Sequence, residues 1–338
     1  MIETQVMERR QRTPVSELEF IGCDPVRVSA VEIEAPEWEG RRVEYWHAAT
    51  ETAWMAREAA SPYHEVPSRR LPALVERICQ ARGSAARCFG SSDLRIRRED
   101  GSLGDLMQPD EAVYLHPGRA RLPQGVALIV GEDDPPDVVL EVDNTTDIRR
   151  GKLIAYRDWG FPEVWVETPD EGSPSRPRSL RPRVTTYVLE DGHYRESPAS
   201  RAFPGWRAED IHRALNEREL SPATDLVLWR VGRALGEAEG TVPEDDPLVR
   251  RVERRGRERG LAEGRERGLA EGRARAALDE RAAMAAAILR HRGVEVPSDF
   301  PAGLAPHDRE VLARAVPDDL VAAASAAPGL ADFLARLR

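Results

Sequence analysis

The chain has 338 residues and a formal net charge of −10 at pH 7, and 41% of its residues are hydrophobic. This length allows one sizeable core with an appendage, or two small domains. The negative charge disfavours broad, non-specific binding to phosphate backbones, which requires clustered positive charge, but it remains compatible with a local basic groove.

Cysteine usage and apolar runs exclude further classes. The cysteines Cys23, Cys79 and Cys88 show no CxxC spacing, which disfavours a zinc site or a disulfide framework and is typical of reduced thiols in the cytoplasm. No apolar run approaches the ~18–20 residues that span a bilayer, and the N-terminal residues are polar, unlike a signal peptide. We therefore expect a soluble, cytoplasmic protein without a membrane partner.

The N-terminal part of the chain predicts strands followed by one helix. Residues 28–33 alternate between apolar and polar, as a half-buried strand does. Residues 43–54 are typical of a hairpin. Apolar residues at helical spacing predict a helix at 68–82, and Gly83 follows where a helix C-cap is expected.

A strand-rich block comes next, with strands expected at 86–90, 94–98, 110–115, 125–130 and 138–142. Asp100-Gly101 is typical of a hairpin turn. Residues 138–142 are continuously apolar except for Glu141, which fits a strand at the centre of a sheet covered on both faces. A helix at 148–159 and a strand at 164–166 follow. This order of helix, strands, helix and strand predicts an α/β fold.

The remainder of the chain is predicted to be a loop, a hairpin and helices. A Pro-, Ser- and Arg-rich loop at 169–183 precedes a hairpin whose turn is Asp191-Gly192. The later helices are expected at 207–219, 222–236, 274–292, 308–315 and 318–336.

A tandem repeat occupies the middle of this helical part. RERGLAEG occurs at 257–264 and again at 265–272, and a glycine stands at every fourth position from 256 to 272. Each interior glycine costs a helix about 1 kcal/mol relative to alanine, whereas a Glu–Arg pair one turn apart returns about 0.2–0.5 kcal/mol. Two interpretations stay open. The helix is a solvated spacer, or its glycine stripe over 250–275 contacts a second copy of the chain in a homo-oligomer.

Three residues of the central block form a candidate site for phosphodiester hydrolysis. Asp110 opens one expected strand, Glu141 lies within another, and Lys152, the only lysine in the chain, follows on the next helix. Carboxylates can hold a divalent metal that neutralises phosphate charge and activates water, and a lysine can position that water. Mg²⁺ prefers such oxygen ligands. The set is therefore typical of a metal-dependent nuclease.

Each of these residues also has a structural interpretation. Asp110, which follows a proline, could cap a turn. Glu141 indicates function because charged side chains are rarely buried unless paired or metal-bound, but on an edge strand it would face solvent. Lys152 could be a surface residue, although a chain that otherwise uses arginine retains lysine where a guanidinium does not serve.

Neighbouring polar residues extend the candidate site. Asp143 lies two residues after Glu141, so its side chain is expected on the same face as a further metal ligand. Asp147 is expected to cap the helix of Lys152. His64 could contact a phosphate, although a lone histidine is more often structural. Tyr156 is expected to pack in the core. The motifs of P-loop NTPases, dinucleotide enzymes, zincins and α/β-hydrolases are absent from the sequence.

The stretch 136–168 resembles the Uma-type restriction endonucleases, a branch of the PD-(D/E)xK nuclease superfamily. The matching residues are, in order, Glu141-Val142, Asp147, Lys152, Tyr156, Gly160, Pro162-Glu163 and Trp165. Upstream, Pro109-Asp110 and the set Ser61, Pro62 and His64 also look like family positions. The resemblance covers roughly 40–200 and is most specific at 137–166.

The resemblance implies a core of one helix, three strands, a second helix and a further strand, which cleaves nucleic acid with Mg²⁺ or with Mn²⁺ in its place. Asp110 and Glu141 would bind metal. Lys152 would replace the lysine that the superfamily usually places two residues after the glutamate, where this chain has Asp143. The turn at 144–146 also departs from the family's usual Ser-Pro. These departures keep open an alternative, a weak or inactive nuclease-fold module that assembles through the glycine-repeat helix.

We therefore predict a restriction-endonuclease-like α/β core, with a central mixed sheet flanked by helices, and an α-helical C-terminal extension. The expected regions are an N-terminal arm with a first strand (1–40), the nuclease-like domain (41–205), a helical connector (206–245), the Gly/Glu/Arg-repeat helix (246–292) and a small helical region (293–338). DNA is the expected substrate. Sequence specificity, RNA as an alternative and the biological role stay open.

Overall fold

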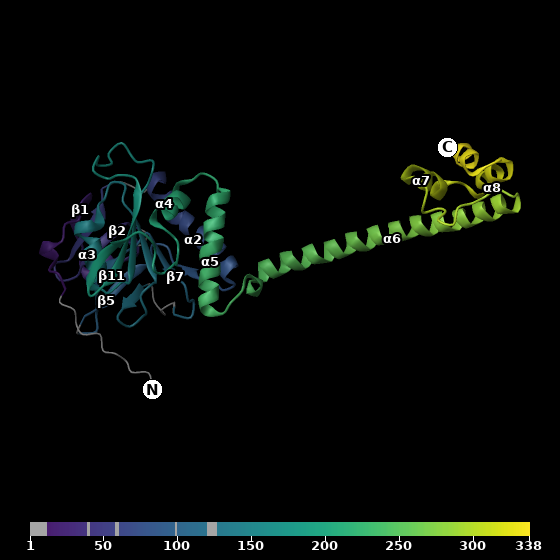
Figure 1. Cartoon of the computed structure of the whole chain (residues 1–338). Coiled ribbons are helices and arrows are strands. Elements are labelled where there is room, and N and C mark those ends of the chain that lie inside the picture. The colour runs from purple at the N-terminus through teal and green to yellow at the C-terminus, as the bar shows by residue number, and fades with distance from the viewer. Residues whose placement is uncertain (1–11, 39–40, 58–60, 99, 120–126) are drawn as a thin grey trace, which may run out of the picture. The chain divides into compact units, whose positions relative to one another are not determined.

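The computed structural model of the chain describes residues 12–38, 41–57, 61–98, 100–119 and 127–338 (Figure 1). Parts of the expected N-terminal region (1–11, 39 and 40) and of one expected strand (125 and 126) lie outside the described residues. The chain forms two compact units, Met1–Arg250 and Arg251–Arg338. Among the described residues, no helix combines the length and the apolar character needed to cross a membrane.

The first unit contains two six-stranded sheets. In spatial order, the first sheet consists of β1 (Cys23–Arg27), β3 (Thr52–Ala56), β2 (Val43–His47), β6 (Leu103–Met107), β5 (Asp93–Arg97) and β8 (Ala127–Val130). The second consists of β12 (His193–Ser197), β11 (Arg183–Glu190), β10 (Glu163–Thr168), β9 (Val138–Val142), β7 (Glu111–Tyr114) and β4 (Arg87–Cys88). Each sheet combines antiparallel pairs with one parallel pair, β5–β8 or β9–β10. The predicted α/β class with a mixed sheet is confirmed.

The second sheet lies between two layers. Helices α2 (Pro62–Arg82), α4 (Ala208–Asn216) and α5 (Pro222–Glu239) cover one face, where Leu71, Leu140 and Trp165 are buried in a common core (Figure 1). The first sheet and α3 (Lys152–Asp158) cover the other face, through residues such as Tyr45 and Val139. All of β9 is buried, as its apolar sequence predicts.

Helix α2 begins earlier than the predicted residue 68. It starts at Pro62, which occupies the first helical turn, where the missing N–H of proline has no cost. The apolar periodicity used for the prediction covers only its later turns, because the first turns carry polar residues. The helix ends at Arg82, and Gly83 adopts a left-handed φ of 83°, as predicted.

The predicted strand at 28–33 is wrong. The strand β1 precedes it, and Ala30–Ile33 forms the short helix α1. Ser29 and Glu32 make a capping box, in which each side chain accepts a hydrogen bond from the other residue's backbone N–H. This local pairing overrides the alternating pattern. The described residues also form the short 3₁₀ helices η1 (Val15–Glu17), η2 (Pro36–Trp38), η3 (Ile148–Arg150) and η4 (Pro243–Asp245).

Two further differences concern single elements, whereas two predicted hairpins agree with the structure. The predicted helix at 148–159 is divided at Gly151 into η3 and α3, where an added Cβ would lie only 2.8 Å from the Glu19 carbonyl oxygen. The strand β6, which pairs with β5 beyond the Asp100-Gly101 turn, was not predicted as a separate element. The hairpins β2–β3 and β11–β12 are confirmed, and Asp191 and Gly192 adopt the positive φ values typical of such turns.

The second unit consists of helices. The repeat and the following apolar stretch form one helix, α6 (Pro247–His291), which lies within the repeat helix predicted at 246–292. Helices α7 (Pro306–Arg314), α8 (Pro317–Ala326) and α9 (Leu330–Leu337) pack against its last turns around Leu289, Leu320 and Phe333. The predicted helix at 318–336 is thus two helices, separated at Pro328 and Gly329.

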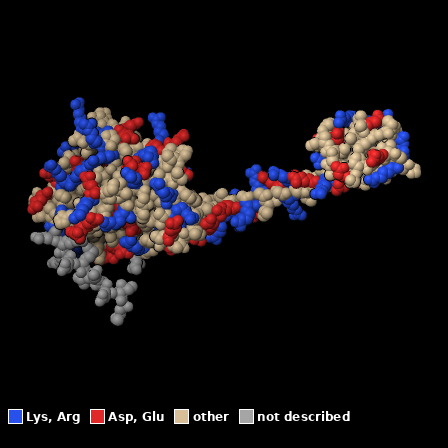
Figure 2. Space-filling model, in the orientation of Figure 1, with Lys and Arg blue, Asp and Glu red and all other residues tan. Residues whose placement is uncertain are grey.

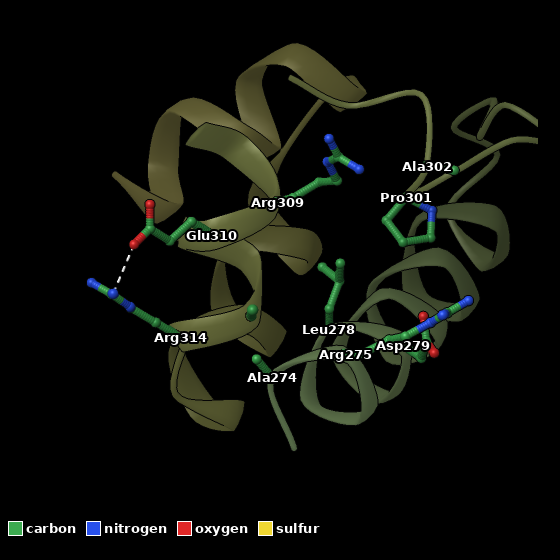
Figure 3. Close-up of a pocket in the computed structure, with 10 residues that line it drawn as sticks. Ala274, Arg275, Leu278, Asp279, Pro301, Ala302, Arg309, Glu310 and Arg314 are labelled. Atoms are coloured by element: carbon green, nitrogen blue, oxygen red, sulfur yellow. Dashed lines mark ion pairs between the residues drawn. The ribbon is translucent and has the colours of Figure 1, made fainter. Parts of the chain in front are cut away.

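Both units expose acidic and basic side chains (Figure 2). In the second unit, a cavity of about 710 Å³ lies between α6 and α7, where Leu278 and Pro301 line it together with Arg309 and Arg314 (Figure 3). Its lining combines apolar and charged residues, and it is remote in sequence from the predicted site residues.

Candidate active site

Glu141 lies in β9, between β7 and β10, so it is not on an edge strand. Its neighbours Leu140 and Val142 belong to the core beneath the helices, whereas Val139 faces the first sheet. Because side chains alternate along a strand, Glu141 also faces the first sheet. Only 1% of the residue is exposed. Its carboxylate is therefore buried between the two sheets and needs partners there.

Lys152 provides one of these partners. It stands in the first turn of α3 and is 1% exposed, which excludes the surface interpretation. Its Nζ donates to Glu141 Oε2 at 2.8 Å, to Glu44 Oε2 at 2.9 Å and to the Gln108 carbonyl oxygen at 2.5 Å. An ammonium group has three protons, so the three acceptors satisfy it completely.

Sequence reasoning missed two of these acceptors. Glu44 lies in β2, among buried residues of the first sheet. It carries the same sequence signal that identified Glu141, an acid between apolar residues in an expected strand. Gln108 follows β6 and contributes its backbone carbonyl, for which the residue type gives no signal.

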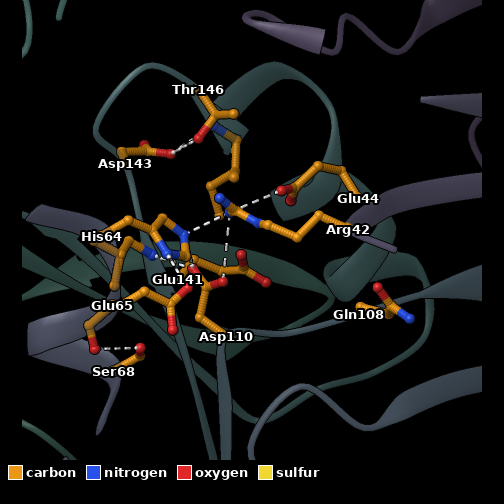
Figure 4. Close-up of polar contacts among 12 residues, drawn as sticks. Arg42, Glu44, His64, Glu65, Ser68, Gln108, Asp110, Glu141, Asp143 and Thr146 are labelled. Carbon is orange, nitrogen blue, oxygen red and sulfur yellow. Dashed lines mark hydrogen bonds and ion pairs between the residues drawn. The ribbon is translucent and has the colours of Figure 1, made fainter. Parts of the chain in front are cut away.

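Asp110 lies where the chain passes from the first sheet to the second. Its Oδ2 accepts a hydrogen bond from the backbone N–H of Val142 at 2.7 Å, directly after Glu141. The same oxygen is 3.1 Å from His64 Nε2, and Oδ1 is 3.7 Å from Arg42 Nη2. The carboxylate therefore bonds across to β9 instead of only capping its own turn, and this places it beside Glu141 (Figure 4).

Arg42 and His64 complete the group (Figure 4). Arg42 Nη2 lies 3.0 Å from Glu44 Oε1 and 2.5 Å from His64 Nε2. His64 is 5% exposed and points at Asp110. A phosphate contact by His64 stays a prediction. Arg42 was not predicted, since one arginine among 48 carries no distinguishing signal.

Tyr156 combines packing with a polar contact. Its ring meets Phe161 edge-on, with centroids 5.1 Å apart, as expected for a core residue. Its hydroxyl donates to Glu141 Oε1 at 2.5 Å. Both oxygens of the Glu141 carboxylate are thus held, one by Tyr156 and one by Lys152.

Asp143 belongs to a different set of contacts. It accepts hydrogen bonds from Arg149 Nη1 at 2.8 Å, from the backbone N–H of Ile148 at 3.3 Å and from Thr146 Oγ1 at 3.4 Å. Figure 4 shows its carboxylate directed to Thr146, away from Asp110. The same-face expectation requires a continuous strand, but β9 ends at Val142.

Asp147 caps η3 instead of the helix of Lys152. Its side chain accepts from the backbone N–H of Arg149, whereas Gly151 is the residue that precedes α3. The reason is the interruption at Gly151, which separates the predicted single helix into two pieces.

Burial and neighbouring charges set the ionisation of the site. Burial raises the pKa of Glu141 well above its usual range, against the opposing effect of Lys152. Burial favours the neutral form of Lys152, but Glu141 and Glu44 outweigh it and raise the pKa of that ammonium. Burial also acts to raise the pKa of Asp110, yet His64 and the nearby cations hold it well below its ordinary value. At neutral pH the group therefore contains at least one carboxylate and one ammonium.

The oxygen donors fit a hard divalent cation in chemical type. The carboxylates of Asp110 and Glu141 and the carbonyl of Gln108 are the kinds of ligand that Mg²⁺ prefers. With the side chains as they stand, no three His, Cys, Asp or Glu groups within the described ranges are placed to hold a metal ion. Lys152 and Arg42 lie between the carboxylates, so a metal would have to replace some of their contacts.

Comparison with known protein families gives a match. A family model, Uma2, described as "Putative restriction endonuclease", matches residues 32–221, which is more than half of the chain. The match includes every residue of the group around Lys152. No curated protein and no solved structure matches the chain.

Proposed function

The chain belongs to the Uma2 family of restriction-endonuclease-like proteins, and from this premise we propose that it is a metal-dependent endonuclease that hydrolyses phosphodiester bonds in DNA. One observation supports the proposal above all. Lys152, the only lysine of the chain, is fully buried and bonded to Glu141, and Asp110 lies beside them although it is distant in sequence. A buried, charged group of this kind has a large desolvation cost, which favours a functional role.

In this proposal, Asp110 and Glu141 hold Mg²⁺, or Mn²⁺ in its place. The bound metal would neutralise charge on the transferring phosphate and lower the pKa of a water molecule. Asp143 is less suitable as a metal ligand than Asp110 and Glu141, because its carboxylate already accepts hydrogen bonds from Arg149 and from the backbone of Ile148.

Lys152 would stabilise the negative charge that develops on the phosphate, since neighbouring carboxylates keep its ammonium protonated. Glu44 and the Gln108 carbonyl fix Nζ in position, and Tyr156 fixes the second oxygen of Glu141. Lys152 extends from a helix towards the carboxylates and would take the role of the lysine that is usual two residues after Glu141. That position can therefore carry Asp143.

Cleavage of supercoiled plasmid DNA by the purified full chain tests the proposal. Wild type should nick or linearise plasmid with Mg²⁺ or Mn²⁺ and leave it intact in EDTA. Asp110→Asn and Glu141→Gln should reduce the rate by about 100-fold or more, the scale seen when charge stabilisation at a reacting centre is lost.

Glu111→Gln is the matched control. Glu111 is also a buried acid, next to Asp110 in sequence, but its carboxylate accepts from the backbone N–H of Gly90 and lies outside the group around Lys152. The Glu111→Gln protein should cut plasmid DNA at the wild-type rate. The proposal fails if folded wild type is as inert as Glu141→Gln, and equal cutting by all variants would identify a contaminant.

A nuclease-fold assembly module without hydrolysis is the second candidate. The observation in its favour is that, apart from the adjacent backbone of α6 itself, no heavy atom of the described residues lies within 4 Å of where a Cβ would stand at Gly256, Gly260, Gly264, Gly268 or Gly272. The backbone of α6 is therefore open to close contact with another helix. Light scattering on the full chain measures whether such contact forms.

A further inference from the structure

Charge is distributed unequally between the two units. Residues 1–250 contain 45 acidic and 33 basic residues, whereas residues 251–338 contain 14 acidic and 16 basic residues. The excess of positive charge is concentrated in 251–275 of α6, which has nine arginines and five glutamates. We call this stretch the basic segment. The unit with the candidate site thus repels phosphate overall, and the basic segment attracts it.

The basic segment is accessible along its whole length. Each of its residues is exposed, and Figure 2 shows arginine side chains spaced along α6. Two of its arginines form ion pairs, Arg254 with Glu258 and Arg259 with Glu263. Within the described parts of the chain, no hydrogen bond or ion pair engages the side chains of the other seven, which are Arg251, Arg255, Arg257, Arg265, Arg267, Arg273 and Arg275.

The spacing of the arginines in the basic segment opposes the helix that carries them. Arg251, Arg255 and Arg259 follow one another at intervals of four residues, so neighbouring guanidinium groups repel by about 0.2–0.5 kcal/mol per pair. The interior glycines of the repeat add about 1 kcal/mol each against helix formation. A polyanion along the helix would remove the repulsion and stabilise the helix as it binds.

We propose that the basic segment binds the phosphodiester backbone of duplex DNA and provides the affinity that the acidic first unit lacks. The choice of DNA as the polyanion rests on the proposed nuclease function. Arginine suits this ligand because its planar fork donates two parallel hydrogen bonds to a phosphate. At a rise of about 1.5 Å per residue, the segment extends about 37 Å, close to one turn of the double helix.

An acidic protein is the less suitable partner. Protein interfaces are centred on aromatic and large apolar side chains that become fully buried. The basic segment contains no aromatic residue, and its large apolar residues, Val252, Leu261 and Leu269, are separated by eight or more positions. Sequence-independent attraction to a regular array of phosphates needs no such anchors.

The test measures how tightly the full chain binds a fluorescent 30-base-pair duplex of about three turns. Fluorescence anisotropy reports the binding, and EDTA is present so that hydrolysis does not occur. The segment variant carries Arg251→Gln, Arg255→Gln and Arg257→Gln. The matched control carries Arg230→Gln, Arg233→Gln and Arg290→Gln, which are exposed helical arginines outside the segment. Glutamine has nearly the helix propensity of arginine, and circular dichroism verifies that helix content is unchanged.

At 0.1 M salt, the affinity of the segment variant for the duplex should be lower than that of wild type by about tenfold or more. The slope of log K against log salt should become shallower by up to about 3, because each of the three lost phosphate contacts contributes roughly 0.9 to it. The matched control should bind as wild type does. Equal loss in both triple variants, no loss in the segment variant, or displacement of DNA by poly-L-glutamate at equal charge concentration would overturn the inference. Segment-dependent binding without metal-dependent cleavage would uphold the inference and reject the nuclease.

Discussion

At Lys152, one ammonium group compensates two buried carboxylates. Lys152→Ala would leave the buried Glu141 carboxylate without its cation, and Glu44 with Arg42 as its remaining cation. Removing one partner of a buried pair costs about 3–5 kcal/mol, so the free energy of unfolding in EDTA should fall by about that amount. Urea denaturation measures it.

A double variant provides the control for this prediction. Lys152→Ala with Glu141→Gln removes one charge of each sign and should be more stable than Lys152→Ala alone. A Lys152→Ala protein as stable as wild type would mean that the carboxylates take up protons at no cost. For this reason, Asp110→Asn and Glu141→Gln are better tests of catalysis than Lys152→Ala.

His212 gives the molecule a separate pH dependence. Its Nδ1 lies 2.9 Å from Glu167 Oε1, and its Nε2 lies 3.1 Å from Asp170 Oδ1. Burial acts to lower the pKa of His212, but the two carboxylates raise it above its ordinary value. The stabilisation is complete below the unfolded-state pKa of about 6.5 and is lost as pH rises through the folded-state pKa.

The free energy of unfolding should therefore decrease as pH is raised from about 6.5 in wild type. His212→Gln should lose this decrease, because glutamine does not titrate. Urea denaturation at several pH values above neutrality provides the comparison. Any pH dependence that originates in the Glu167 carboxylate would remain in the variant, so an unchanged profile would show that His212 does not carry the effect.

Residue type alone identified part of the buried group. Glu141 and Lys152 were detectable because an acid inside an apolar strand and a single lysine among arginines are both unusual. Glu44 carried the first of these signals and was missed. Arg42 and the Gln108 carbonyl were not detectable, since their roles come from the approach of one sheet to the other. Asp143 was predicted on the same face as Glu141 from the alternation of side chains along a strand, but β9 ends at Val142, one residue before Asp143.

At the scale of elements, glycine acts in opposite ways in α5 and α6. Gly232 allows α5 to approach α2 closely, since a Cβ there would lie 2.3 Å from the Ile78 carbonyl oxygen and 2.6 Å from Ala81 Cβ. Gly256 faces open space. Gly232→Ala should destabilise the first unit through this clash, by about 1–3 kcal/mol.

Gly256→Ala should instead stabilise α6 by about 1 kcal/mol, because alanine has the higher helix propensity and meets no neighbour. Thermal unfolding followed by circular dichroism can compare both variants with wild type. If Gly256→Ala were destabilising, a partner of the glycine stripe would be indicated, and the spacer interpretation of α6 would be wrong.

Element ends followed the chemistry of single residues wherever that chemistry was local. Gly83 and Asp191-Gly192 end their elements as predicted, because a positive φ is a property of the residue itself. Ser29 and Glu32 form a capping box that is readable as S-x-x-E, whereas the alternating pattern around it predicts a strand. The pairing of the strands into two sheets was not predictable, since it depends on contacts between residues far apart in sequence.

At the scale of the whole molecule, each unit has its own apolar core. Leu140 and Trp165 belong to the core of the first unit, and Leu289 and Phe333 to that of the second. The candidate site is built entirely within the first unit, whereas the excess positive charge lies in the second. Hydrolysis and retention of DNA would thus be separable functions, which different variants can remove independently.

The basic segment also bears on self-association, the other role predicted for 250–275. Two copies of α6 in contact would bring nine arginines of each segment together. At 0.01 M salt, charges interact over about 30 Å, compared with about 10 Å at 0.1 M, so repulsion should keep the chains apart at low ionic strength. Light scattering should then give the mass of one chain, 37.7 kDa.

The variant with Arg251→Gln, Arg255→Gln and Arg257→Gln separates charge from glycine packing. If only repulsion prevents pairing of the glycine stripe, this variant should associate at a lower salt concentration than wild type does, and the matched variant at Arg230, Arg233 and Arg290 should not. A stable wild-type dimer at low salt would contradict the prediction, because helix contact through the glycines would then outweigh the repulsion between the arginines.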